Sequence, residues 1–527
     1  MSLLSQKPMV NRQSLLCILV IVFSFKLLIA QESNGQKMIL FAGDENVNRI
    51  ELIPLLKSRF SDNLKEEVLI EDCRRIEEYY EDEGFLETIC EYELIKTGDK
   101  SPLRVVFSID KGELFRFGNI TVEGNKHVNK EFIFGRLKFK SGSPFTKKSI
   151  LSSQVALMKN GLFDDVEVLV DRYDHEQQVI SVKVSVKERK KFYTDLGTGI
   201  DTEDGWRNFI GWGNRNFDGY GKQLNFSALH ALDYAGGLYF KKGEITGKYV
   251  DPALYSYKLR FDWSISYLTD RPKGVNFGFE RYRSIIGFHH LINDLSQISY
   301  NIVFEKNNLF EVEFDENDKT FRDYIGREEN RGLDIIYTYD SRDNYLDPYE
   351  GQNLEIRFKN AFTVFGGDNT YGQVDLKQSC YLLIGSQFVL ANRISVSGQF
   401  FYGNQEELPS YMRLYLGGST SLRGYSESSV GPKNDDGSAQ GGYYSFVDNI
   451  EMRYYLSYNT NIVLFMDTGN LWLAEEMIKL NTLKYTTGLG LRVHSRFGLF
   501  RLDYGVRITD FDQNSPGRLH FGFGQAF

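Results

Sequence analysis

Strict alternation of apolar and polar residues runs through most of the chain after residue 190 and limits what this part can fold into. In "LKYTTGLGLRVH" (483–494), the odd-numbered positions are apolar, aromatic or Thr, and the even-numbered ones carry Gly, Thr or charge. A period of two is that of a β-strand. Such segments are about 10–14 residues long, whereas strands of soluble sandwiches average about six. Long strands with one apolar face are typical of a transmembrane β-barrel.

About sixteen such segments lie between Phe192 and Phe527. Several connections between them are short, such as "FDGYG", "DPALYS" and "LIGS", and one on the same side is longer, "DSRDNYLDPYEG". The longest connections, at 306–330, 403–442 and 474–481, fall on the opposite side. Short turns on one side and long loops on the other indicate an outer-membrane barrel. All six prolines after residue 190 fall in predicted connections, as ladder hydrogen bonding requires. The sequence therefore predicts a 16-stranded antiparallel barrel over 191–527.

Before residue 190 the pattern mixes helices and strands. Residues 31–112 and 113–190 each read as a strand, a short helix, a longer amphipathic helix and two alternating strands. The longer helices are expected to stop at Gly84 and Gly161, because glycine favours the backbone conformation that ends a helix. The N-terminal part is therefore predicted to be two tandem α+β domains with the order β-α-α-β-β, followed by the all-β barrel.

Residues 1–30 read as a signal peptide rather than a membrane anchor. Arg12 supplies the positive region, 15–23 the apolar core and Ala30 a small residue before the mature chain. The apolar run is short for a spanning helix, and no later stretch approaches 18 uninterrupted apolar residues. We therefore expect an exported protein.

Export permits disulfides, so the cysteines of the mature chain matter. The predicted helix runs toward Gly84 and the next strand runs back, which places Cys73 and Cys90 at similar heights. A disulfide between them is geometrically possible, and the alternative is that both are inert core residues. Cys380 is expected to be inert.

Several function classes are disfavoured by composition and spacing. A net charge of −9 argues against a nucleic-acid binder, which needs a basic face. The seven histidines are scattered without metal-ligand spacing, and we find no nucleophile elbow. The acidic run at 77–83 is more simply a solvated helix face than an acid/base pair. We expect no enzyme, no metal and no cofactor.

The loop motif "GGSTSLRGY" (417–425) begins a stretch, 417–437, that lies between two alternating segments and is too long and too polar for a hairpin turn. An ordinary solvated arginine is one interpretation of Arg423. The neighbouring strands offer another, because facing Ile450 and Met452 toward lipid turns Glu451 inward. The same parity, with Ile462, Leu464 and Met466 toward lipid, turns Phe465 and Asp467 inward.

Several linked motifs occur in a fixed order, which is stronger evidence than any single strand. They are "GGSTSLRGY" (417–425), "VGP" (430–432), "FMDTGN" (465–470), "TTGLGLRVHSRFGLFRLDYG" (486–505) and the terminal aromatic strand. Through them the chain resembles the BamA/TamA family of outer-membrane assembly proteins, which carry periplasmic POTRA modules before a C-terminal surface-antigen barrel. The resemblance covers nearly all of the mature chain.

The resemblance implies that the loop 403–442 folds back inside the barrel, where Arg423 meets carboxylates of the inner wall. Gly424 is expected to let the backbone turn tightly, and Tyr425 to pack on the wall. The residues of this loop-to-barrel clamp are Leu422, Arg423, Gly424, Tyr425, Glu451, Phe465, Asp467 and Gly469.

The resemblance also implies a weak lateral seam between the first and last strands, residues 192–201 and 518–527. An open strand edge has unpaired N–H and C=O groups that can template an incoming strand. The modules would guide substrates by pairing with their own edge strands. The seam residues are Phe192, Tyr193, Gly197, Gly199, Phe521, Gly522, Phe523, Gly524 and Phe527.

These expectations imply an outer-membrane barrel with periplasmic N-terminal domains. Its partners would be unfolded outer-membrane proteins, membrane lipids and periplasmic chaperones or accessory subunits.

Two-partner-secretion transporters also carry two modules before such a barrel, but they usually add a plug helix and linker. Because Gln31 leads almost directly into the strand at 37–43, we favour assembly over dedicated secretion. A passive channel is disfavoured because the loop would occupy the lumen.

Overall fold

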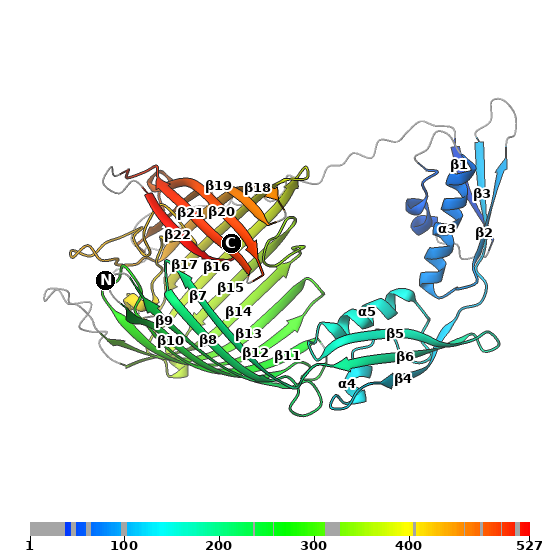
Figure 1. Cartoon of the computed structure of the whole chain (residues 1–527), viewed down its shortest axis with the longest axis horizontal. Coiled ribbons are helices and arrows are strands. Elements are labelled where there is room, and N and C mark those ends of the chain that lie inside the picture. The colour runs from blue at the N-terminus through cyan, green and yellow to red at the C-terminus, as the bar shows by residue number, and fades with distance from the viewer. Residues whose placement is uncertain are drawn as a thin grey trace, which may run out of the picture. The chain divides into compact units, whose positions relative to one another are not determined.

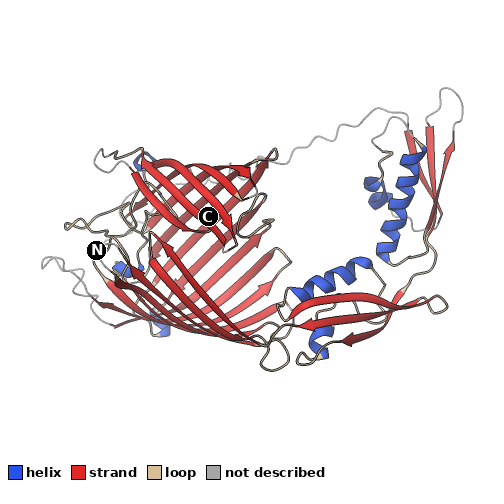
Figure 2. Ribbon diagram, viewed as in Figure 1, coloured by secondary structure: helices blue, strands red, loops and turns tan. Residues whose placement is uncertain are grey.

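The computed structural model describes residues 37–43, 49–59, 65–95, 103–234, 238–256, 258–310, 327–403, 407–457, 459–474, 478–496, 498–511 and 517–527. The predicted signal peptide lies outside the described residues. Two small α+β modules precede a large barrel of strands (Figures 1 and 2).

The first module is a three-stranded sheet covered by one long helix. Its elements are β1 (Lys37–Gly43), α2 (Arg49–Leu52), the 3-10 helix η1 (Ile53–Leu55), α3 (Glu66–Glu83), β2 (Ile89–Ile95) and β3 (Leu103–Asp110). The strand order is β1-β3-β2, so β1 and β2 are edge strands. Helix α3 buries Leu69, Ile76 and Tyr80 on one face and ends at Gly84, whose φ of 103° is left-handed.

The second module repeats this order of elements. They are β4 (Arg116–Glu123), α4 (Lys130–Phe134), α5 (Lys147–Met158), β5 (Phe163–Asp174) and β6 (Val179–Glu188), with the strand order β4-β6-β5. Alternate residues of β6, namely Ile180, Val182 and Val184, are fully buried. The predicted β-α-α-β-β order is confirmed.

The carboxylate of Glu188 holds the turn after β4. It accepts hydrogen bonds from the backbone N–H groups of Lys126 (2.7 Å), His127 (2.8 Å) and Val128 (2.8 Å). Partial burial raises the pKa of Glu188, but these donors outweigh it and hold the pKa below its usual range.

We therefore predict acid-sensitive order in this turn. A depressed carboxyl pKa gives stability that is present above the unfolded pKa, about 4.3, and lost as pH falls through the lower folded value. Hydrogen-exchange protection at 126–128, corrected for intrinsic rates, should fall as pH drops from about 5 toward 3. The Glu188→Gln variant should lack this pH dependence. If the variant lost protection over the same pH range as the wild type, the Glu188 carboxylate would not be the group that orders the turn.

The barrel contains 16 antiparallel strands, each paired with its sequence neighbours, so the predicted fold class is confirmed. The strands are β7 (Phe192–Asp201), β8 (Gly205–Asn214), β9 (Gln223–Asp233), β10 (Tyr239–Asp251), β11 (Leu259–Asp270), β12 (Gly278–Leu291), β13 (Ser296–Phe310), β14 (Arg327–Asp340), β15 (Gly351–Ala361), β16 (Tyr371–Ile384), β17 (Phe388–Phe401), β18 (Tyr444–Ser457), β19 (Thr460–Trp472), β20 (Lys484–Ser495), β21 (Gly498–Arg507) and β22 (Gly517–Phe523).

The two faces of the strands differ as transmembrane strands require. In β19, Leu464 and Met466 are exposed, whereas Phe465 and Asp467 between them are buried. Apolar outer positions suit lipid, and the inner positions carry the polar groups. Among the helices that the structure describes, none combines the length and apolarity needed to cross a bilayer.

One predicted connection is shorter than expected. The sequence placed 306–330 in a loop, but β13 continues to Phe310 and β14 begins at Arg327. Asn308 pairs with Arg327 in the ladder, and Lys306 bonds to Glu329 at 3.2 Å. Polar residues occupy both faces of these strand ends, so alternation is lost although the hydrogen-bonded ladder continues.

Candidate functional site

The connection between β17 and β18 packs on the inner wall of the barrel. Its residue Leu422 is fully buried in a cluster with Leu416, Tyr425, Val430, Val447 and Leu471. Gly469 of β19 makes room for it, because a Cβ there would lie 2.4 Å from the Phe446 carbonyl oxygen and 3.1 Å from Leu422 Cδ1. The loop is therefore seated by packing as well as by charge.

Arg423 is bonded to two carboxylates of the wall. Its Nε and Nη2 donate to the two oxygens of Asp467 at 3.0 and 2.6 Å, and its backbone N–H donates to the same carboxylate at 3.0 Å. Nη1 donates to Glu451 at 2.6 Å. The guanidinium lies 3.5 Å from the centre of the Phe465 ring. Arg423 is 1% exposed and both carboxylates 0%, so these are desolvated, charge-assisted hydrogen bonds.

A wider network of buried charges surrounds this pair. Arg453 donates to the second oxygen of Glu451 at 2.9 Å, and Arg492 donates to Asp503 at 2.6 Å. Asp467 also accepts from Asn449 at 2.8 Å. Buried charges need such partners, because an unpaired one carries the full desolvation cost. The alternation along their strands also turns Arg453, Arg492 and Asp503 toward the lumen, but we did not predict that these residues belong to the site.

Two glycines let the loop touch the wall, and only one was expected. The expected tight turn is present at 422–425, where the Tyr425 N–H donates to the Leu422 carbonyl oxygen at 3.0 Å, but Gly424 does not need a positive φ for it. Its role is close approach, since a Cβ there would lie 2.8 Å from Thr486 Cγ2. A Cβ on Gly505 of β21 would lie 2.5 Å from the Arg423 carbonyl oxygen. The sequence feature that could have identified Gly505 is a glycine at an inward-facing position of a predicted strand, where another backbone can approach closely.

Substituting Gly505 with alanine should therefore push the loop away from the wall. We expect a loss of about 1–3 kcal/mol in barrel stability, typical of overpacking, measured by urea unfolding in detergent micelles. Gly398→Ala is the matched control, because its Cβ would meet only Tyr444, at an ordinary 3.4 Å. Equal midpoints for the two variants would mean that the loop does not need this contact.

Tyr425 completes the packing of the loop. Its hydroxyl donates to the Thr509 carbonyl oxygen at 2.9 Å, and the Arg507 guanidinium lies 5.1 Å from the centre of its ring. Arg507 also donates to the Gly424 carbonyl oxygen at 3.1 Å. The structure thus brings together all eight residues proposed for the clamp.

The terminal strands of the barrel are adjacent but not joined by a ladder. The sheet order begins at β22 and ends at β7, and β7 pairs with β8. Between the two strand regions, the structure has a backbone hydrogen bond from Thr202 N–H to the Phe521 carbonyl oxygen at 3.2 Å. A Cβ on Gly199 would lie 3.6 Å from the Phe523 ring. Most of the β7 edge therefore keeps unpaired backbone groups.

The last four residues leave the seam, which corrects our expectation that Phe527 continues the terminal strand. Strand β22 ends at Phe523, and Gly524 has a left-handed φ of 81°. Gln525 then donates to Asp347 at 2.7 Å, and the Phe527 ring lies 4.9 Å from the Arg393 guanidinium. The inward turn leaves the 192–198 part of β7 without a facing strand.

The anchored loop reaches both sides of the seam. Glu203, in the turn before β8, accepts the Ser419 N–H at 2.6 Å. His520 of β22 donates from Nε2 to the Arg423 carbonyl oxygen at 2.8 Å. The loop therefore bridges the first hairpin and the last strand on the lumenal side.

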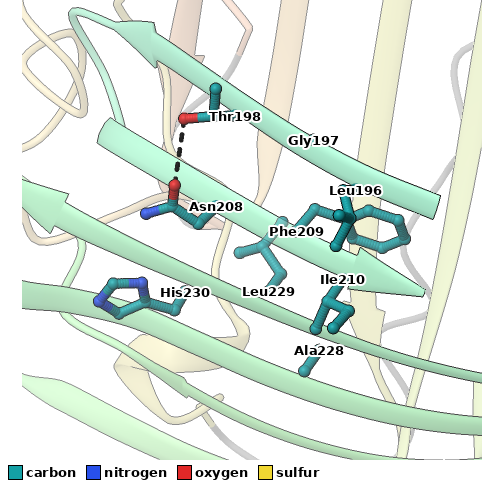
Figure 3. Close-up of a pocket in the computed structure, with 9 residues that line it drawn as sticks. All are labelled: Leu196, Gly197, Thr198, Asn208, Phe209, Ile210, Ala228, Leu229 and His230. Atoms are coloured by element: carbon teal, nitrogen blue, oxygen red, sulfur yellow. Dashed lines mark hydrogen bonds between the residues drawn. The ribbon is translucent and has the colours of Figure 1, made fainter. Parts of the chain in front are cut away.

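A shallow hollow of about 520 Å³ adjoins the seam on β7, β8 and β9 (Figure 3). Its lining residues include Leu196, which is 78% exposed, and Thr198, which donates to Asn208 at 3.1 Å. Residues 194–198 are all exposed, so neither face of this stretch is covered.

Within the described residues, no group of His, Cys, Asp and Glu could hold a metal ion.

Comparison with known proteins gives consistent results. The family model described as the Omp85 superfamily domain matches residues 216–527, and the POTRA model, a surface antigen variable number repeat, matches 115–189.

Three relatives and solved structures illustrate the similarity. The outer membrane protein assembly factor BamA of Nitratidesulfovibrio vulgaris is 22% identical over 88% of this chain and 57% of its own length. The SAM50-like protein of Schizosaccharomyces pombe is 24% identical over 78% of this chain and 90% of its own. The structure of Haemophilus ducreyi BamA lacking POTRA domains 1–3 has a TM-score of 0.68 at 17% identity, covering 92% of this chain and 98% of that one.

A second solved structure is also similar. CdiB from Acinetobacter baumannii has a TM-score of 0.53 at 14% identity, covering 95% of this chain and 92% of that one. The chain spans little more than half the length of the bacterial assembly factors that it matches first, at 57% and 55%.

Proposed function

Because the chain belongs to the Omp85 superfamily, we propose that it inserts and folds β-barrel proteins in the outer membrane. The family and fold predicted from the loop and strand motifs are confirmed by the matched models and by the BamA relatives. The barrel lies in the outer membrane and the modules in the periplasm.

The observation that carries the proposal is the unpaired edge of β7. Backbone N–H and C=O groups without partners are costly in lipid, so this edge is a favourable place for another strand to add. A client strand that pairs with residues 192–198 satisfies these groups and enters the bilayer at the same step. The exposed faces of 194–198 give its side chains room.

The anchored loop supports this role by holding the wall on both sides of the seam. Its bonds to Glu203 and His520 connect the two terminal strand regions while leaving the β7 edge itself free. A lumen that contains this loop favours a lateral route for clients over a passive solute channel.

The modules are proposed to deliver clients by strand addition. Strand β2 is an edge of the first sheet, and Glu91, Glu93 and Leu94 on it are exposed. Main-chain pairing recognises an extended chain without requiring one sequence, which suits unfolded barrel clients. Membrane lipids next to the seam and periplasmic accessory subunits are the further proposed partners.

Dedicated secretion of one polypeptide is the second candidate, favoured by the shared fold with CdiB and by the two modules. Depletion of the chain followed by profiling of outer-membrane proteins separates the candidates. Broad loss of barrel proteins, reversed by re-expression, is expected for assembly. Loss of one exported protein would instead establish secretion, and altered solute uptake with an intact protein profile would establish a channel.

A further inference from the structure

The first module has a smaller aromatic core than the second. In the part of the first module that the structure describes, the buried phenylalanines are Phe41 and Phe107. The second module buries Phe115, Phe117, Phe132, Phe139, Phe145 and Phe163. Small domains with limited cores commonly need a covalent staple, and the first module contains two cysteines where the second contains none.

Those cysteines already face each other. Cys73 on α3 and Cys90 on β2 are 6% and 8% exposed, and their sulfurs lie 3.1 Å apart, with the Cys90 thiol donating to Cys73. Both are free thiols in this structure. Glu77 of α3 also accepts the Cys90 backbone N–H at 2.9 Å, which fixes the strand against the helix. Only a small side-chain rotation separates the pair from bonding distance, about 2.05 Å.

We propose that Cys73 and Cys90 are oxidised to a disulfide in the periplasm and that this bond staples α3 to the edge strand β2. The two thiols lose two protons and two electrons, and one S–S bond forms. The oxidant is the disulfide of a periplasmic thiol oxidoreductase, which is reduced to a dithiol after a mixed-disulfide intermediate. Because both sulfurs are buried, the exchange takes place while the module is folding.

The electrostatics of the pair suit this chemistry. The hydrogen bond from Cys90 lowers the pKa of the Cys73 thiol, whereas the same bond and burial raise the pKa of Cys90. The thiolate is the nucleophile in exchange, and in the folded module Cys73 is the thiol that ionises more readily. If the proposed client pairing is correct, the staple also keeps the β2 edge rigid for it, although the disulfide itself does not depend on that function.

Mass spectrometry of full-length protein tests the bond directly. Cells are quenched in acid, thiols are blocked with N-ethylmaleimide without reductant, and the protein is digested with trypsin. Cleavage after Lys65, Arg74, Arg75 and Lys96 places the two cysteines on peptides 66–74 and 76–96. We expect these peptides to be linked, with Cys380 alkylated as the internal control. Alkylation of both Cys73 and Cys90 in most molecules would overturn the proposal.

Hydrogen exchange of the full-length protein tests the staple. A disulfide that closes the loop 73–90 should make the opening of α3 and β2 rarer, so that their backbone amides exchange about a hundredfold more slowly. Adding reductant to the wild type should remove that protection, and the Cys73→Ser/Cys90→Ser variant should not respond to reductant. Unchanged exchange in reduced wild-type protein would refute a stapling role even if the linked peptides were found.

Discussion

Replacing Arg423 with alanine should leave most barrels unfolded or inactive. The substitution leaves the fully buried carboxylate of Asp467 without its arginine partner and removes one of the arginines paired with Glu451. Removing one partner of a buried ion pair typically costs about 3–5 kcal/mol, a large part of the stability of an ordinary domain. The loop would also lose the stacking of the guanidinium on Phe465.

Heat-modifiable gel migration measures the folded fraction, and complementation of a depleted strain measures activity. Arg423→Lys should be intermediate, because an ammonium keeps the charge but cannot form the paired bonds to Asp467. Arg331→Ala is the matched control, because its ion pair with Glu329 is partly exposed and worth about 0–1 kcal/mol. Wild-type migration and growth of Arg423→Ala would show that the loop is not held by this arginine.

The barrel could be predicted from the sequence because lipid imposes a rule on every outer position. An outward residue such as Leu464 must be apolar, so each crossing strand leaves a period of two that can be counted. Where strands extend beyond the bilayer, as at Lys306–Phe310, that rule no longer applies and the prediction placed a loop. The predicted strand number was therefore better than the predicted strand ends.

The interior of the site was less predictable, because parity gives the direction of a side chain but not its partner. It turned Glu451 and Asp467 inward, but it could not show that Arg453 and Arg492 also pair with Glu451. Phe527 was misplaced for a related reason. An aromatic residue that continues the alternation reads as part of the strand, and only the left-handed Gly524 ends it.

Stapling the seam should abolish client insertion. A Cβ on Gly522 would lie 3.8 Å from the Cβ of Asp201, which is the separation that a disulfide requires. In a Cys73→Ser/Cys90→Ser/Cys380→Ser background, oxidised Asp201→Cys/Gly522→Cys protein should insert clients into vesicles at least about tenfold more slowly than its reduced form. The reason is that a bond between the terminal strand regions prevents a client strand from extending along the β7 edge.

A staple in a closed part of the same wall separates blocked opening from general rigidity. Ser397 and Ser445 face each other in the ladder of β17 and β18, which are already joined by hydrogen bonds. Oxidation of Ser397→Cys/Ser445→Cys should therefore leave insertion unchanged. Reductant should restore only the seam-stapled protein, and each single-cysteine variant should be insensitive to it. Full insertion by the oxidised seam variant would mean that clients do not enter the membrane between β7 and β22. Since every other described pair of adjacent barrel strands is joined by a ladder, that result would contradict lateral insertion through this barrel.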